Sequence, residues 1–403
     1  MKEFNISLNI NNKHYKIIFI FYLIFLFLSC FTIIPYVDSY YYWLWSNNLQ
    51  MSYVDGPPLI GYTIKLATLI FNNSVFAINF VGFTISIISF IIVFNLSTIL
   101  FQTNKYSFKI ALLWLSSYII VGHRIITFVT YDGLENIFEL SILLSTLKYF
   151  NNNKNKYLYQ IGIFSGFALL SKYSAIVLII SILIFFLYKK SLRHVFKSYH
   201  LYIAVLLCIT IFSPVLIWNI KNQYVSFIYQ LTFHTLNDNN GIIINVLSYL
   251  MKAIISPLIP MIIILLIIKF KFNSNLQFSN SQQISLHLIF TVIATIFIFW
   301  LLMSTFASIP DRYFLLLYSL IFILVGYLLL KNNYNKLFLL ILIYNLSFSI
   351  GDIVSHSLST RNPYCSKLYI NSGLLNFNSP LKNFIKTNKN SSNFCYEKIK
   401  EIK

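Results

Sequence analysis

The chain has 403 residues, of which 58% are hydrophobic, 18% aromatic and only 10% charged, and its mean hydropathy is +0.72. This composition excludes an ordinary soluble globular protein and is typical of a polytopic membrane protein. The net charge of +19 does not indicate nucleic-acid binding. Most basic residues lie in short segments between apolar runs, where they set topology and meet anionic lipid headgroups.

Long apolar runs predict an all-α protein with about 11 transmembrane helices, because a crossing needs about 20 apolar residues. The expected spans are residues 17–34, 74–101, 110–122, 133–150, 158–170, 174–188, 201–218, 246–268, 284–304, 313–330 and 337–350. Residues 57–71 are amphipathic and too interrupted for a span, which indicates a helix in the outer membrane interface. We therefore expect a transmembrane domain over residues 1–350, with an outer loop at 35–73, and a short polar tail over 351–403.

Basic residues alternate between the two sides of these spans. With the N-terminus inside, the inner segments hold 16 of the 30 Lys and Arg residues, the outer connections six, and the tail the remaining eight. This asymmetry follows the positive-inside rule and predicts the topology, with the tail outside. The aspartates that then lie on the outer side are Asp38, Asp55, Asp132, Asp238 and Asp311. We expect the functional site on that side.

The first outer loop, residues 37–59, places Asp38 and Asp55 among many Tyr and Trp residues. Rings stack on sugars and acyl chains while a carboxylate handles a proton or a hydroxyl, so a site for a lipid-linked sugar explains the combination. Each aspartate also has a structural explanation by itself. Asp38 is suited to capping a following helix, and Asp55 precedes Gly56 in a turn signal.

Three acids share one face of the predicted helix that begins at Asp132. Asp132, Glu135 and Glu139 have the spacing i, i+3, i+7, and exposing such a face to lipid is costly. We expect this face to look into a cavity or to meet cations. The candidate partners are His123, Arg124 and Lys172. Asp132 and Glu135 also fit a capping box, and a structural salt bridge is an alternative for Glu139.

Two cations near the predicted outer side are candidates for binding a phosphate. Lys172 lies within an apolar hairpin, where it either binds a ligand or snorkels to the headgroups. Arg312 follows Asp311, which offers it a structural partner, and it suits a phosphate equally well. In the tail, Cys365 and Cys395 are able to form a disulfide if the tail is exported and stay reduced if it is cytoplasmic, and the sequence leaves the bridge open.

Several common chemistries have no support in the sequence. No His or Cys residues have the spacing of a metal site, so no metal is predicted, although a divalent cation is left open. No Walker A, GxGxxG or GxSxG motif occurs, which argues against nucleotide-driven transport and serine hydrolysis.

Five ordered blocks over residues 37–230 resemble the bacterial GT-C glycosyltransferases of the dolichyl-phosphate-mannose–protein mannosyltransferase type, with lipid A aminoarabinose transferase as a more distant relative. The blocks are DSYYYWLWS at 38–46, YVDGPPL at 53–59, TYD at 130–132, LLSKY at 169–173, and SPVLIWN at 213–219 followed by SF at 226–227. Two positions depart from the family pattern. The second carboxylate of its Asp-Glu pair is Ser39 here, and the His of its D-H-P-P motif is Gly56. Either change alters the acceptor or lowers the activity.

The resemblance implies a GT-C helical bundle that transfers a sugar, with inversion, from a polyprenyl-phosphate carrier to a lipid, glycan or protein acceptor. The reaction is expected at the periplasmic face of the bacterial inner membrane, with no cofactor and no nucleic acid. The resemblance also implies Asp38 as the general base, with Asp55 and Asp132 positioning hydroxyls. The implied substrate-binding residues are Lys172, Arg124 and Arg312 at the departing phosphate, and Tyr41, Trp43, Tyr53 and Tyr173 around it.

Two other classes of function are compatible with the residues. A carrier or flippase for lipid-linked sugars also needs acids and cations that face a membrane cavity. Inverted repeats and Gly-broken helices would favour transport, and the sequence has neither. A degenerate family member that acts as a binding partner is the third possibility, and the departures at Ser39 and Gly56 keep it open.

Overall fold

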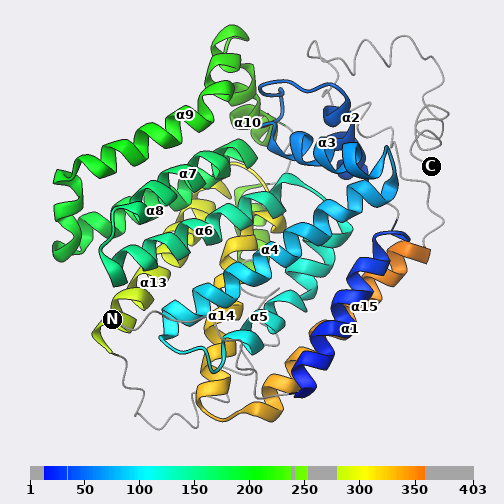
Figure 1. The fold of residues 1–403 in the computed structure, drawn as a ribbon. Coiled ribbons are helices and arrows are strands. Elements are labelled where there is room, and N and C mark those ends of the chain that lie inside the picture. The colour runs from blue at the N-terminus through cyan, green and yellow to red at the C-terminus, as the bar shows by residue number, and fades with distance from the viewer. Residues whose placement is uncertain (1–12, 34, 237–240, 253–278, 359–403) are drawn as a thin grey trace.

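A computed structural model of the protein describes residues 13–33, 35–236, 241–252 and 279–358 (Figure 1). Helices make up almost all of this part of the chain, and the described residues contain no β-strand beyond an isolated bridge between Tyr53 and Gly56. The N-terminal half holds α1 (Lys13–Ser29), α2 (Val37–Asn47), α3 (Leu59–Phe71), α4 (Val75–Phe101), α5 (Ser107–Leu115), the π-helix η1 (Tyr118–Thr127), α6 (Tyr131–Asn152), α7 (Lys156–Ser171), η2 (Tyr173–Ala175) and α8 (Ile176–Tyr188). The C-terminal half holds η3 (Lys190–Lys197), α9 (Tyr199–Lys221), α10 (Val225–Leu236), α11 (Ile242–Leu250), α13 (Asn280–Met303), η5 (Asp311–Phe314), α14 (Leu315–Lys331) and α15 (Asn335–Leu358).

The predicted all-α membrane fold is confirmed, while the number of crossings is not. Five described helices are long and apolar enough to cross a membrane, and up to seven spans result if each of two bent helix pairs counts as one. The expected 11 spans therefore remain a prediction. Residues 253–278, which hold most of the expected span 246–268, lie outside the described residues.

Local signals in the sequence explain where the long helices begin and end. At the start of α4 the Ser74 hydroxyl accepts a hydrogen bond from the Ala77 backbone N–H at 3.2 Å, which satisfies a donor that the helix leaves free. The helix stops at Gln102, whose φ of 53° lies in the left-handed region. Ser279 and Gln282 form a capping box at the start of α13.

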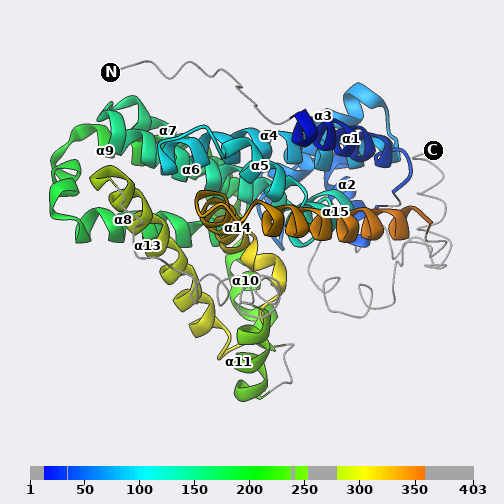
Figure 2. The same cartoon turned by 90° about the horizontal axis from the view of Figure 1, so that it is seen from below.

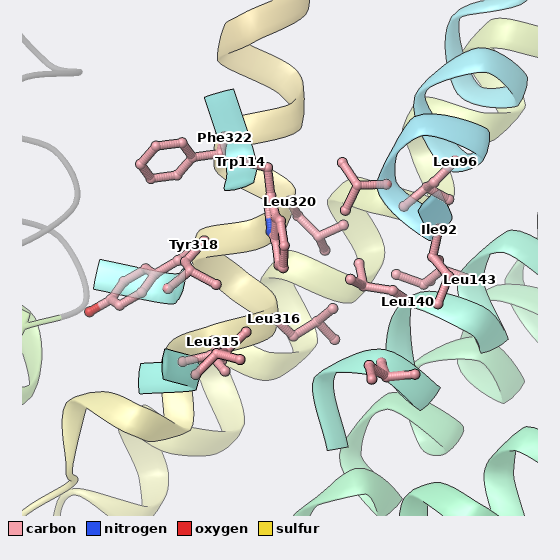
Figure 3. Close-up of a cluster of buried hydrophobic side chains, with 14 of the residues drawn as sticks. Ile92, Leu96, Trp114, Leu140, Leu143, Leu315, Leu316, Tyr318, Leu320 and Phe322 are labelled. Atoms are coloured by element: carbon pink, nitrogen blue, oxygen red, sulfur yellow. The ribbon is translucent and has the colours of Figure 1, made fainter. Parts of the chain in front are cut away.

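The centre of the bundle is a core of buried hydrophobic side chains around α14 (Figure 3). In α14 with its preceding turn, 78% of the most apolar window is buried, whereas in α9 the share is 11%. The side chains of Leu316 and Leu320 point from α14 toward those of Ile92 on α4 and Leu140 on α6. Helix α14 is therefore surrounded by protein, and α9 presents most of its aliphatic surface to the lipid.

Glycines allow α7 to pack directly against α9. A Cβ on Gly162 would overlap the carbonyl of Ala204, and one on Gly166 would meet the side chain of Ile211 at 2.7 Å. Only the absence of a side chain permits this approach of two backbones. The contact fixes α9 at the edge of the bundle, as Figure 1 shows.

Polar side chains join the first and last described helices, which lie next to each other (Figure 1). The Tyr22 hydroxyl of α1 and the Ser349 hydroxyl of α15 are 2.6 Å apart, and Thr32 meets Ser357 at 3.0 Å. Helix α15 runs past the expected end of its span at residue 350 and ends at Leu358. The remainder of the predicted tail, with Cys365 and Cys395, lies outside the described residues.

One expected span is not a continuous helix, and another is followed by a sharp bend. The span at 110–122 is a pair, α5 and the π-helix η1, bent by 50°, and α8 turns by 112° into the basic helix η3. Helices α10 and α11 project from the body of the bundle in Figure 2. Helices α2 and α3 lie within the expected outer loop at 35–73, and α3 matches the helix expected at residues 57–71.

Candidate active site

The turn between α2 and α3 is held rigid by its aromatic residues. The backbones of Tyr53 and Gly56 pair through hydrogen bonds of 3.0 and 3.3 Å. The Tyr53 ring stacks on Trp45, with ring centroids 3.9 Å apart and an angle of 10° between the planes. Its hydroxyl is also within 3.0 Å of the Trp45 carbonyl and 2.9 Å of the Asn48 carbonyl. Tyr53, predicted to bind substrate, therefore shapes the turn that carries Asp55.

Asp55 sits in this turn with one carboxylate oxygen enclosed by protein. Oδ1 is buried and has no hydrogen-bond partner among the described residues. Burial raises the pKa of Asp55 to about 7, with a smaller contribution from the charge of Asp38, and the hydrogen bond with Tyr41 opposes the rise. From α10, the Gln230 side-chain amide donates to the Asp55 backbone carbonyl at 2.5 Å. The aspartate thus has an environment that favours holding a proton near neutral pH.

Asp38 lies in the first turn of α2 and forms an ion pair across the bundle. Its Oδ2 is 3.3 Å from Nη1 of Arg312, at the start of η5. The helix cap of α2 is Tyr36 and makes no side-chain capping bond, so the capping explanation for Asp38 is wrong. The Nε of Arg312 is buried and has no hydrogen-bond partner within the described part of the chain. The guanidinium therefore keeps donor capacity for a further ligand.

Asp132 and Glu135 hold Lys172 in a second buried cluster. The Nζ of Lys172 is 2.7 Å from Asp132 Oδ1 and 3.7 Å from Glu135 Oε2. Thr130 donates to Asp132 Oδ2 at 2.8 Å, and Ser174 donates to Glu135 Oε1 at 2.5 Å. The relative exposure of Lys172 is only 7%, which excludes snorkelling to the headgroups.

The capping-box interpretation of Asp132 and Glu135 is wrong. The N-cap of α6 is Thr130, and it makes no side-chain capping bond. Asp132 and Glu135 both lie within α6 and pair with Lys172. The prediction that this acidic face meets a cation is therefore confirmed for these two residues. Glu139 lies one turn further along and is also buried. His123 and Arg124 were the other candidate partners, and their side chains are not among those that the structure describes.

Tyrosine rings lie close to the cations of both clusters. Lys172 Nζ is 3.7 Å from the ring centroid of Tyr313, and Arg312 Cζ is 6.0 Å from the same centroid. The ring of Tyr131 lies 5.4 Å from Lys172 and 5.2 Å from the ring of Tyr42 on α2. Both cations and their aspartates are therefore parts of one site with aromatic walls.

Ser39, which replaces the second acid of the family motif, has a structural partner. Its buried hydroxyl accepts a hydrogen bond at 3.1 Å from the backbone N–H of Val129, just before α6. This bond ties the helix of Asp38 to the segment that leads into Asp132. Gly56 is the second position that departs from the family motif. A Cβ atom there would lie 3.9 Å from Trp45, an ordinary van der Waals contact, so the surrounding space does not require glycine.

The remaining predicted ligand residues have mainly structural contacts. The Trp43 indole N–H donates to Asn73 Oδ1 at 2.9 Å. The Tyr173 hydroxyl is 2.8 Å from the Ser226 hydroxyl of α10 and 3.4 Å from that of Ser52. Tyr173 thus connects the turn of Asp55 with α10, beside Lys172. Tyr41 reaches Asp55 from α2.

Sequence reasoning missed Tyr313, Tyr131 and Ser174 as members of the site. Tyr131 and Ser174 adjoin predicted residues, Asp132 and Tyr173, and Tyr313 directly follows Arg312. A rule that includes the neighbours of each predicted site residue would have found all three. Among the residues that the structure describes, no group of His, Cys, Asp or Glu could hold a metal ion.

The fold and the site together define a multi-pass membrane protein with a charged, aromatic-walled site built from α2, α6, η2 and η5. Comparison with known proteins narrows the class further. The family described as dolichyl-phosphate-mannose-protein mannosyltransferase matches residues 55–218. The resemblance that the motifs indicate is therefore confirmed for this region. No protein with a curated description matches the sequence.

Solved structures share the fold at low sequence identity. ArnT from Cupriavidus metallidurans bound to undecaprenyl phosphate aligns with a TM-score of 0.60 and 12% identity, covering 80% of this chain and 62% of that one. Its apo state gives a TM-score of 0.59 at the same identity and coverage. The archaeal oligosaccharyltransferase AglB from Archaeoglobus fulgidus gives 0.54 at 12% identity, covering 96% of this chain and 60% of that one. The chain has the GT-C fold and spans about three fifths of the length of these proteins.

Proposed function

We propose that the protein transfers a sugar from a polyprenyl-phosphate carrier to an acceptor hydroxyl at the outer face of the membrane. The observation that carries this proposal is the placement of Lys172 and Arg312 beside the ring of Tyr313, each paired with an aspartate. Cations suited to a phosphate and carboxylates suited to a proton thus share one site. The ArnT structure is bound to undecaprenyl phosphate, which supports a polyprenyl phosphate as the ligand class.

The chemistry is a single displacement at the anomeric carbon of the donor sugar. The acceptor oxygen forms the new bond to this carbon while the bond from carbon to the phosphate oxygen breaks. The polyprenyl phosphate leaves with the bonding electron pair, and the acceptor proton passes to the Asp38 carboxylate. One displacement inverts the configuration. Lys172 and Arg312 stabilise the charge that develops on the departing phosphate.

Positions of the other carboxylates fit supporting roles. Asp132 and Glu135 hold Lys172 in place, and Asp55 contributes a second carboxyl group close enough to Asp38 to interact with its charge. The charge asymmetry of the loops supports a site on the outer side. A bacterial inner membrane, with a periplasmic site, is the setting that the ArnT likeness favours.

Sugar transfer by purified protein in proteoliposomes tests the proposal. Radiolabelled polyprenyl-phosphate sugars are supplied together with total membrane lipid, and labelled product is measured for the wild type and for Asp38→Asn. The variant keeps size and hydrogen bonding but cannot take the proton, so turnover should fall by about two to four orders of magnitude. If this variant transfers sugar at nearly the wild-type rate, Asp38 is not the general base, and the base must be Asp55 or Asp132. No transfer from any donor by the wild type would refute the proposed function.

A further inference from the structure

The short helix η3, which connects α8 with α9, carries a basic surface away from the candidate active site. Lys172 lies just before α8 and η3 lies just after it. The 13 residues of α8 separate the two by roughly 20 Å at about 1.5 Å per residue. We propose that η3 binds the phosphate headgroups of anionic phospholipids at the end of the bundle opposite the active site. This inference goes beyond the proposed function and does not depend on it.

The order of residues in η3 gives the helix one apolar face and two polar faces. It is a 3₁₀-helix, in which side chains three positions apart share a face. Leu192 and Val195 form the apolar face, where Val195 is fully buried and Leu192 packs against the core. Lys190 and Arg193 share the second face and Lys197 lies on the third, and all three are exposed. The helix therefore packs through its apolar face and leaves its cations outside.

The cations of η3 have no carboxylate to compensate them. Neither Asp nor Glu occurs in the helix, and among the described residues no acid pairs with Lys190, Arg193 or Lys197. Like charges this close repel one another, so an anion bound between them stabilises the surface. The ligand that this surface fits is therefore negatively charged.

Arg193 is oriented for such a ligand. Its Nε donates a hydrogen bond to the Leu187 carbonyl, near the end of α8, at 2.8 Å. This bond holds the guanidinium beside the bend, while its terminal amino groups have no hydrogen-bond partner in the described part of the chain. A guanidinium with these groups available matches the oxygens of a phosphate.

The position of η3 favours a lipid over a soluble anion. The chain turns by 112° between α8 and η3, so η3 lies across the direction of the apolar helix instead of continuing it. Tyr188, Tyr199 and Tyr202 flank η3, and all three are largely exposed. Exposed tyrosines are typical of the level of the lipid headgroups. A basic segment at that level meets the phosphates of anionic lipids.

Removal of the three exposed charges tests the proposal. The wild type and the triple variant Lys190→Gln, Arg193→Gln, Lys197→Gln are purified in neutral detergent. Binding of phosphatidylglycerol in competition with phosphatidylcholine is then measured by native mass spectrometry. The preference for phosphatidylglycerol should fall roughly ten- to a hundredfold in the variant, because each basic residue near an anionic lipid surface contributes about fivefold.

A matched control removes the same number of charges elsewhere. Lys13 and Lys16 on α1 and Lys336 on α15 are exposed, and the charge asymmetry predicts them on the same side of the membrane as η3. Their triple replacement by Gln should change the preference by less than about threefold, because surface charges more than about 10 Å apart are largely screened. Thermal unfolding confirms the fold of each variant.

Three outcomes would overturn the inference. They are an unchanged lipid preference in the η3 variant, an equal loss in the control, and displacement of phosphatidylglycerol by inorganic phosphate at the same concentration, which would assign the surface to a free anion. If the triple variant of η3 does not fold, the double variant Lys190→Gln, Lys197→Gln decides, because it keeps the Arg193 bond to Leu187. Its preference should fall by about tenfold or more.

Discussion

At the scale of single residues, Lys172 shows how burial couples folding to ligand binding. Its ammonium compensates Asp132 and Glu135, both almost fully buried. Lys172→Ala leaves these carboxylates without their nearest cation, which should cost about 3–5 kcal/mol of stability. It should also weaken polyprenyl-phosphate binding roughly ten- to a hundredfold, because a charge-assisted contact is lost. Thermal unfolding and ligand binding measure the two effects separately.

A second substitution separates the two roles of Lys172. Adding Asp132→Asn to Lys172→Ala removes one of the uncompensated charges, so part of the stability should return. Binding should not return, because the ammonium is still missing. Recovery of both properties in the double variant would show that Lys172 acts on the ligand only through the fold.

Asp55 makes the turn between α2 and α3 sensitive to pH. Its carboxyl has a pKa of about 7 in the folded protein because burial disfavours the charge, against 3.8 as its ordinary value. The folded turn is therefore favoured most below pH 4 and loses stability as the pH rises from 4 to 7, with no further change above. Hydrogen exchange of residues 48–58 should rise over that interval in the wild type.

The same measurement on two variants identifies the responsible group. In Asp55→Asn the exchange rate, corrected for the intrinsic effect of pH, should be flat over that interval. Asp352 lies on α15 and accepts a hydrogen bond from Thr127 at 3.1 Å. The control variant Asp352→Asn should keep the wild-type pH dependence of exchange. A pH dependence that survives in Asp55→Asn would assign it to another residue.

At the scale of elements, the contact of α7 with α9 depends on the size of a single side chain. Gly162→Ala forces a Cβ into the carbonyl of Ala204, so the helices must separate, at a cost of about 1–3 kcal/mol. Gly351→Ala makes the same change in α15, where a Cβ meets nothing within 4 Å. It should stabilise the protein by up to about 1 kcal/mol through helix propensity. Thermal unfolding of both variants should therefore shift in opposite directions, and equal shifts would contradict the close approach of α7 and α9.

Helices with strong local signals could be predicted from the sequence, and those shaped by their neighbours could not. The span expected at 74–101 matches α4, because a long apolar run follows the cap at Ser74. The bend between α5 and η1 has no such signal within the apolar run. The capping box at Asp132 failed because Lys172, forty positions away, takes the carboxylate instead. A local pattern does not reveal a competing partner that only the tertiary structure supplies.

The site shows the same limit over longer distances. Family motifs locate Asp38, Asp55, Asp132 and Lys172, and the structure brings the last two into direct contact. The partnership of Asp38 with Arg312 joins positions 274 residues apart. Within its own segment, Arg312 had an adjacent acid in Asp311. Asp38 and Arg312 meet only because η5 packs close to α2 in the folded protein. The sequence of either segment alone therefore does not predict this ion pair.

At the scale of the whole molecule, the charge asymmetry predicts which ends of the helices share a side of the membrane. Asn48 follows α2 and Asn152 ends α6, and both side chains are exposed. Single cysteines at these two positions, in a background without the native cysteines, should be labelled from opposite sides by a membrane-impermeant reagent. Labelling of both from one side would refute the topology and with it the outer location of the site.

The distance in sequence between Asp38 and Arg312 also bears on how the protein is made. Translation proceeds from the N-terminus at about 5–20 residues per second, so Asp38 leaves the ribosome some tens of seconds before Arg312. Throughout that interval Arg312 is not yet available to Asp38, and the core around α14 is still missing its central helix. A chain interrupted before residue 312 thus lacks both the arginine that pairs with Asp38 and the helix at the centre of the core. The charged site is therefore completed late in biogenesis, and incomplete chains reach the membrane without it.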